Sequence, residues 1–293
     1  LNVPLGIATI LLTLMYITHE WADAEGEQFD LRGSVIYGAM LFSGIFGLLL
    51  LPDPAGIAWI LGGIIAAAFF VWWQTQCSHP ILDLGIFRAN RTFTFSNIAA
   101  MINYGATFGV GFLLSLYLQY IRGFSAETAG LILVAQPIVQ TILSPVAGRI
   151  SDRVEPQVVA TIGMGITTLG LSFFIFLGPD TPLFMIIGAL MVLGLGYAFF
   201  SSPNTNAIMS SVDKRYLGIA SGMVATMRSL GQVLSMAIAM ICFSVLIGSV
   251  TVTPSVYPAL MESTTIAFFI FTILCVMGVA ASYVRGTIHA DKA

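Results

Sequence analysis

The stretch Gly148-Arg149-Ile150-Ser151-Asp152-Arg153 decides the fold of this chain. It places three charged side chains within five residues, between the apolar segments 136–147 and 158–177. A charged turn this short between two apolar segments can lie only at a membrane surface, and its positive charges favour the cytoplasmic side. The stretch therefore predicts a membrane protein and orients every other segment.

The composition agrees with a protein that crosses the membrane many times. Of the 293 residues, 57% are hydrophobic and 9% are charged, whereas a soluble domain carries roughly 25% charged residues. The three cysteines show no paired spacing, and the three histidines are far apart in the chain. We therefore expect no catalytic residues, no metal site, no cofactor and no nucleic-acid partner.

The apolar segments predict an all-α fold. Each is long enough for a helix that spans the bilayer, although the first is short. Proline and glycine mark the joints between them. The nine predicted spans are 3–18, 33–51, 55–75, 95–121, 126–148, 158–177, 183–207, 217–248 and 262–284.

The spans divide the chain into successive parts. The first predicted part is the span 1–18, and the second is an acidic cytoplasmic loop. A hairpin of two helices and an amphipathic cytoplasmic linker follow, and then a six-helix bundle and a cytoplasmic tail. These last five parts are 19–32, 33–75, 76–94, 95–285 and 286–293.

The positive charges fix the predicted orientation. If the turn at 148–153 is cytoplasmic, alternation of the spans puts nine positive residues on the cytoplasmic side and only Arg122 on the opposite side, while Arg228 lies inside a span. This bias predicts an integral protein of the cell membrane with a cytoplasmic C-terminus. The nine residues are Arg32, Arg88, Arg91, Arg149, Arg153, Lys214, Arg215, Arg285 and Lys292.

Strongly polar side chains are confined to four of the last six spans. Gln136, Gln140 and Ser144 share one helix face, and so do Arg228, Gln232 and Ser235. Polar residues in a span usually face the bundle interior or a water-filled cavity. The alternative is a hydrogen bond between helices, and for any single amide the two are equally favoured. For the whole set we predict a substrate cavity lined by Asn97, Asn103, Tyr104, Gln136, Gln140, Asn204 and Gln232.

Arg228 is the most informative of these residues. It lies 11 residues into its span, roughly 17 Å from the predicted membrane surface. A charge at that depth is a functional-site hypothesis, although a structural arginine could instead bind helix carbonyls or extend toward the membrane surface. No span contains a carboxylate positioned to pair with it, so its counter-charge is expected from substrate or from helices outside this chain.

Small residues and prolines predict how the helices pack. Gly105 and Gly109 are four residues apart, as are Gly218 and Gly222, and this spacing is typical of close helix contacts. Pro137 and Pro145 are expected to kink the span that holds them.

The opening stretch resembles the loop motif of the major facilitator superfamily, Gly-x-Leu-x-Asp-Arg-x-Gly-Arg-Arg. The first half matches, with Ile150 in place of leucine, and the second half departs, with Glu155-Pro156-Gln157 in place of Gly-Arg-Arg. Other segments resemble the fourteen-helix drug:proton antiporters of the EmrB/QacA type. They are Asn2-Val3-Pro4-Leu5-Gly6, the linker 80–88, the segments 118–120, 123–125 and 129–131, and Arg228-Ser229-Leu230-Gly231.

The resemblance implies a proton-coupled exporter of amphipathic drugs. The nine spans would then be helices six to fourteen, with residues 1–18 the last helix of an N-terminal bundle whose first five helices precede Leu1. Its partners would be the lipid bilayer, small amphipathic substrates, protons and that bundle. A gate would form at Gly148, Arg149, Asp152 and Arg153, with Arg149 ending one span and Asp152 beginning the next.

Two other functions stay open from the sequence. One is export of a single metabolite, siderophore or lipid by a member of the same superfamily. The other is a membrane enzyme or scaffold, which is less favoured because an enzyme would need paired carboxylates or a cluster of histidine and cysteine.

Overall fold

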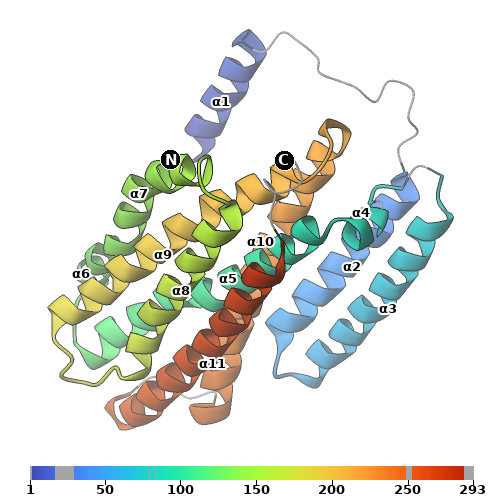
Figure 1. Cartoon of the computed structure of the whole chain (residues 1–293). Helices are drawn as coiled ribbons and strands as arrows, with labels where there is room; N and C mark the ends of the chain where they lie inside the picture. Colours follow the sequence, from blue (N-terminus) through green and yellow to red (C-terminus); the bar gives the residue numbers. More distant parts are fainter. Residues whose placement is uncertain (1, 17–29, 79, 83, 249–252, 287–293) are drawn as a thin grey trace.

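The computed structural model describes residues 2–16, 30–78, 80–82, 84–248 and 253–286. All regular structure in these ranges is helical, as predicted (Figure 1). Eight helical segments are long and apolar enough to cross a membrane. The first predicted span forms only α1 (Asn2–Tyr16), a 15-residue helix. The eight are α2 (Leu31–Leu50), α3 (Pro54–Gln76), α5 with η1 (Arg91–Ile121), α6 with α7 (Ala126–Ser151), α8 (Pro156–Ile175), α9 (Leu183–Ser210), η2 with α10 (Lys214–Leu246) and η3 with α11 (Pro254–Val284).

Short polar side chains start several of these helices at the joints that the sequence marks. The Asp53 carboxylate accepts a hydrogen bond from the Ala55 N–H at 2.8 Å, directly before Pro54 at the first helical position. Asn90 caps α5 in the same way, through the Phe93 N–H at 2.8 Å. Each cap satisfies an N–H that the first turn of a helix leaves unpaired.

A break divides the span 126–151 into α6 (Ala126–Leu133) and α7 (Ala135–Ser151). The break is at Val134, three residues before Pro137. Proline has no N–H, so the Leu133 carbonyl receives no hydrogen bond from position 137, and the helix is interrupted there. Pro145 lies inside α7.

The helices from α5 to α11 form one bundle around a shared apolar core. α5 packs extensively on α10 and α11, while α9 packs on α7 and α8. α8 and α11 also contact each other and lie in front of α5 in Figure 1. The helices differ strongly in burial. In the most apolar 18-residue stretch of each span, 61% of the residues are buried in α5 but only 11% in α6 with α7. α5 is therefore the central helix, and α7 is an edge helix with an open side.

Glycine brings α5 and α10 into close contact. A Cβ on Gly231 would lie 2.4 Å from the Met101 carbonyl oxygen and 2.8 Å from the Tyr104 Cβ. Gly109 faces Ser235, whose hydroxyl accepts its N–H at 2.8 Å. The prediction of close packing was wrong for Gly218 and Gly222, where a Cβ would meet nothing within 4 Å. They instead line a cavity between α10 and the hairpin of α2 and α3.

The α2–α3 hairpin is attached to the bundle along α10. The Tyr37 and Thr226 hydroxyls are 2.8 Å apart. At the hairpin's open end, the Asp30 carboxylate accepts hydrogen bonds from the Gly33 N–H and from the Trp73 and Gln74 side chains. Partial burial acts to raise the pKa of Asp30, but these hydrogen bonds outweigh it and hold the pKa below its usual value.

The Gln74 side chain connects the hairpin to the linker by accepting the Leu82 N–H at 3.1 Å. The linker contains the short helix α4 (Leu84–Ala89). It is tied to α5 by the Thr94 hydroxyl, which donates to the Phe87 carbonyl at 2.7 Å. Asn90 also donates to the Ser211 carbonyl, so the linker touches the turn between α9 and α10.

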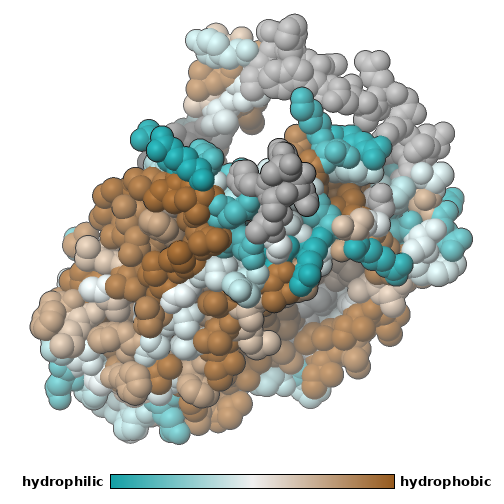
Figure 2. All heavy atoms as spheres, in the orientation of Figure 1, coloured by the Kyte–Doolittle hydropathy of each residue, from teal (hydrophilic) through white to brown (hydrophobic). Residues whose placement is uncertain are grey.

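Apart from Arg228, the described basic residues lie at the two ends of the bundle. Eight lie at the end that holds α4 and the turns before α8 and α10, whereas Arg122 lies at the other end and donates to the Pro179 and Thr181 carbonyls. The surface between the ends is largely hydrophobic (Figure 2). The eight are Arg32, Arg88, Arg91, Arg149, Arg153, Lys214, Arg215 and Arg285; Lys292 lies outside the described residues.

The α5–α10 contact yields a stability prediction. Gly231→Ala should lower the free energy of unfolding by about 1–3 kcal/mol, because the new methyl group would overlap the α5 backbone. Gly222→Ala is the matched control on the same helix and should leave stability unchanged or slightly raised. Thermal unfolding of the purified variants in detergent measures both. Equal stability of the two variants would contradict the close contact.

Candidate functional site

An aromatic and cationic cluster lies at the middle of the bundle. The guanidinium carbon of Arg228 lies 5.2 Å from the centre of the Tyr104 ring. Tyr104 also meets Tyr197 edge to face, with ring centres 5.6 Å apart and planes at 78°. The Tyr104 and Ser201 hydroxyls are 3.5 Å apart. We call Tyr104, Tyr197, Ser201 and Arg228 the Tyr104 cluster; it joins α5, α9 and α10.

Backbone packing positions this cluster. Gly231 lets α10 approach α5 at Tyr104, and Arg228 lies three residues before Gly231, on the adjacent turn of α10. Residues three apart share a helix face, so the guanidinium is brought over the ring. A cation over an aromatic face is stabilised by the ring quadrupole, by roughly 0.5–2 kcal/mol.

The two main members of the cluster differ in exposure. Tyr104 is 8% exposed, while Arg228 is an exposed residue. A charge far inside a span usually faces protein or a water-filled cavity, because contact with lipid is unfavourable. The side of the bundle that carries Arg228 is therefore suited to face a cavity or another protein surface.

Three of the predicted cavity amides are half-buried and lie on α7 and α10. Gln136 and Gln140 are half-buried on α7, and Gln232 is half-buried on α10. Ser235, on the predicted face of Arg228, is fully buried and bonded to the Gly109 N–H. Its role is a hydrogen bond between helices, which is the alternative left open by the sequence.

The two predicted asparagines of α5 are buried inside the bundle. Asn97 is 1% exposed and donates to the Phe93 carbonyl at 2.9 Å. Asn103 is fully buried, and neither atom of its side-chain amide has a hydrogen-bond partner among the described residues.

Asn204 belongs to a second polar cluster, which the sequence did not suggest. Its side-chain oxygen accepts from an Arg285 guanidinium N–H at 2.7 Å, and its amide donates to the Ser96 carbonyl at 3.1 Å. Arg285 also donates to the Pro156 carbonyl at 2.6 Å and to the Ser96 hydroxyl at 3.3 Å. This Arg285 cluster joins α5, α8 and α9 to the end of α11.

Arg285 is fully buried, which is unusual for an arginine. Burial lowers its pKa to about 10, while the charge of Glu155 acts in the opposite direction. The side chain is therefore still protonated at neutral pH. Sequence reasoning counted Arg285 only as a positive charge at the end of a span, since no local pattern shows that Asn204 and Ser96 lie beside it.

The turn at 148–153 lies at the same end of the bundle as the Arg285 cluster. Arg149 is in the last turn of α7, as expected, and its charge suits the negative end of that helix. The expectation for Asp152 was wrong: it forms the C-cap of α7, and the acid that precedes α8 is Glu155. A Cβ on Gly148 would lie 3.3 Å from the Ser202 hydroxyl, so the α7 end approaches α9 closely. Arg149, Asp152 and Arg153 are exposed.

Nothing in the described ranges resembles a metal centre, since no three histidine, cysteine or acidic side chains gather there. The sites are instead a cation on the Tyr104 ring and a buried arginine network.

Comparison with known proteins identifies the family. The family model described as Major Facilitator Superfamily matches residues 5–236 and 96–292. The chain belongs to this superfamily. It is therefore an integral membrane protein of a transporter family and not an enzyme.

Its relatives include proteins named for drug resistance and for a vitamin. The riboflavin transporter RibZ of Clostridioides difficile is 30% identical over 81% of this chain and 52% of its own length. The multidrug resistance protein Stp of Mycobacterium tuberculosis is 26% identical over 81% and 44%. The tetracenomycin C resistance and export protein of Streptomyces glaucescens is 24% identical over 85% and 47%. The chain thus spans about half the length of these relatives.

The Arg285 cluster gives a second stability prediction. Asn204→Ala should destabilise the protein by about 2 kcal/mol, because it removes a charge-assisted hydrogen bond from a buried guanidinium. Asn206→Ala, two residues further along α9 at an exposed position, is the matched control. Thermal unfolding in detergent compares them. Equal midpoints would show that Arg285 does not depend on Asn204.

Proposed function

We propose that this protein is a proton-coupled exporter of amphipathic drugs that works by alternating access. One observation carries the proposal: an exposed guanidinium, Arg228, is held on the Tyr104 ring in the middle of an apolar helix. Family membership supports a transporter, and the names of Stp and the tetracenomycin C export protein support drug efflux.

The Tyr104 cluster suits a cargo that combines apolar rings with a few polar groups. Half-buried Tyr197 offers a ring surface, and Gln136, Gln140 and Gln232 offer half-buried amides. Tyr104, which is 8% exposed, contributes by holding the Arg228 guanidinium. Ligand sites of this kind are mainly apolar, with few polar groups that fix orientation. Asn97, Asn103 and Asn204 are left out of the proposed site because their side chains are buried within the bundle.

A second bundle would complete the cavity. The aligned part of this chain covers only about half of each relative's length, and α7 and the Arg228 side of α10 have little of their surface covered. We place the second bundle against these helices. The turn at 148–153 would then lie between the bundles, with Gly148, Arg149, Asp152 and Arg153 as a gate that stabilises one state.

Arg228 would serve proton coupling. On the second bundle, a carboxylate close to Arg228 would have a lowered pKa, because a nearby positive charge favours the ionised form. A state change that separates the two would raise that pKa and let the carboxylate take a proton. Drug release and proton uptake would then belong to the same step.

The coupling role predicts a split between binding and transport. Arg228→Ala should abolish drug-induced proton release while leaving drug affinity within about twofold, because Arg228 acts mainly on the carboxylate. Arg228→Lys should keep part of the coupling, since it keeps the charge but loses the forked geometry. Proton release and drug affinity are measured together on the purified transporter. Normal coupling in Arg228→Ala, or a loss confined to affinity, would refute the role.

The orientation gives a separate prediction. We propose that the end with eight basic residues faces the cytoplasm, because positive charge is enriched there in membrane proteins. Single cysteines replace Lys214 at that end and Asp180 at the other, in a protein whose Cys77, Cys242 and Cys275 are changed to serine. A membrane-impermeant maleimide added to intact cells should label Asp180→Cys and not Lys214→Cys. The reverse pattern would invert the topology.

A transporter of one metabolite is the second candidate, favoured by the likeness to RibZ. The two candidates differ in selectivity. A drug exporter should move several unrelated amphipathic compounds, each competing with the others for export. Export of one compound alone, with no competition from the rest, would favour the second candidate.

A further inference from the structure

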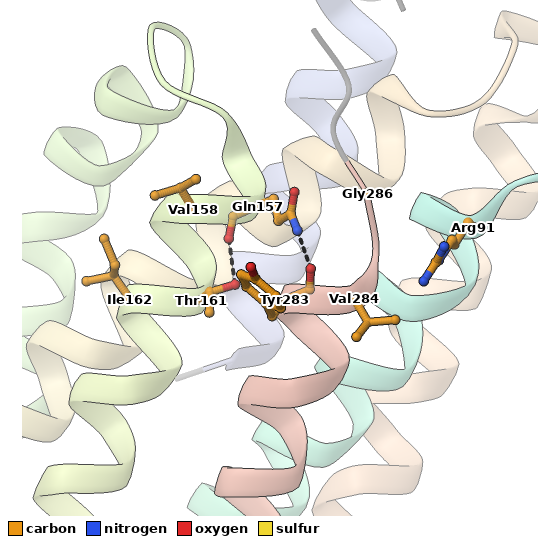
Figure 3. Close-up of a pocket in the computed structure, with 8 residues that line it drawn as sticks. All are labelled: Arg91, Gln157, Val158, Thr161, Ile162, Tyr283, Val284 and Gly286. Carbon is orange, nitrogen blue, oxygen red and sulfur yellow. Dashed lines mark hydrogen bonds between the residues drawn. The ribbon is translucent and has the colours of Figure 1, made fainter. Parts of the chain in front are cut away.

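A groove of about 680 Å³ opens at the basic end of the bundle, on the side of α8 and α11 (Figure 3). It runs between the first turn of α5 and the first turns of α8, and the end of α11 crosses it. Its polar lining includes Arg91, Gln157 and Thr161, and its apolar lining includes Val158, Ile162 and Val284.

The groove is separate from the proposed transport site. Arg91 and Tyr104 are 13 residues apart on α5, which corresponds to about 20 Å along a helix. The groove also opens beside α8 and α11, whereas Arg228 lies on α10. A ligand here would not compete directly with cargo at the Tyr104 cluster.

The polar side chains of the wall hold the groove in shape. Gln157 donates to the Tyr283 carbonyl, and the Thr161 hydroxyl lies 2.7 Å from the Gln157 carbonyl and 2.9 Å from the Ser282 hydroxyl. These bonds join α8 to the end of α11. The wall is therefore fixed by the bundle's own contacts.

Arg91 supplies the positive charge of the groove. It is exposed, and its guanidinium carbon lies 5.7 Å from the Phe95 ring centre. The other nearby arginine, Arg285, is buried in its own cluster with Glu155 close by. Arg91 is thus the cation of the lining that an incoming anion can reach.

The apolar wall continues onto the membrane-facing surface. Val158 is 46% exposed and Ile162 is 53% exposed, one turn apart on α8. Further exposed apolar side chains follow on the same two helices, including Leu169 and Met277. A ligand in the groove would contact a cation at one end and hydrocarbon-facing side chains at the other.

We propose that the groove binds an anionic glycerophospholipid from the adjacent leaflet. Its phosphate would pair with Arg91, and an acyl chain would lie along Val158 and Ile162. Basic pockets between membrane helices bind lipid headgroups through this combination of charge and shape, and an arginine–phosphate contact is a strong charge-assisted bond. A soluble phosphate would leave the apolar wall uncovered, so a lipid fits the whole groove.

Lipid binding to the purified protein tests the proposal. Native mass spectrometry measures the affinities for phosphatidylglycerol and phosphatidylcholine, with glycerol 3-phosphate as a soluble competitor. The parent should prefer phosphatidylglycerol by about fivefold, the factor expected for one basic residue at a membrane surface. Arg91→Gln should remove the preference. Ile162→Trp, which fills the apolar wall, should weaken binding of both lipids.

Arg88→Gln is the matched control, because Arg88 is an exposed arginine three residues away and outside the groove lining. It should retain the preference. Equal affinity of the parent for the two lipids would overturn the proposal, as would the same loss in Arg88→Gln and Arg91→Gln. Displacement of phosphatidylglycerol by glycerol 3-phosphate would assign the groove to a soluble anion, and unchanged binding in Ile162→Trp would remove the acyl-chain contact.

Discussion

The hydrocarbon core of the bilayer offers no hydrogen-bond partners, and the structure follows from that constraint. Backbone groups must be satisfied within the protein, so the described chain is helical wherever it would cross the membrane. Side-chain polarity is subject to the same rule. Ser235 is bonded to the Gly109 N–H, and Arg285 is surrounded by oxygen acceptors from three other helices. Arg228 is different, because it rests on a tyrosine ring at an exposed position.

This difference separates two uses of polar residues that look alike in the sequence. Asn204 and Gln232 are both amides on apolar helices, and both were predicted to line a cavity. Asn204 has both atoms of its side-chain amide hydrogen-bonded inside the buried Arg285 cluster. Gln232 is instead partly exposed, one turn from Arg228 on α10. In the first case, polarity fastens helices together; in the second, it is available to something outside the bundle.

Much of the fold could be predicted from local sequence. The charged turn at 148–153 and the Pro and Gly joints located the spans, because each acts within a few residues. Helix pairing could not be predicted in the same way. Gly218 and Gly222 have the spacing of contact glycines but face a cavity, while Gly231, without that spacing, touches α5. Likewise, the burial of Arg285 depends on Ser96 and Asn204, which are 189 and 81 residues away in the chain. Of the candidate site, Tyr104 and Arg228 could be selected from residue type and depth, but Tyr197 could not, because a tyrosine in a span is ordinary.

The hydrogen bonds at the two ends of the bundle have a mechanical consequence. At one end, Arg285 fastens α11 to α5, α8 and α9. At the other, the Tyr117 hydroxyl and the Arg122 guanidinium hold the turn between α8 and α9 through the carbonyls of Gly178 and Pro179. Hydrogen bonds at both ends would resist shear between the helices of this bundle. A rearrangement of the protein would then be expected where the bundle meets its surroundings, and not between its own helices.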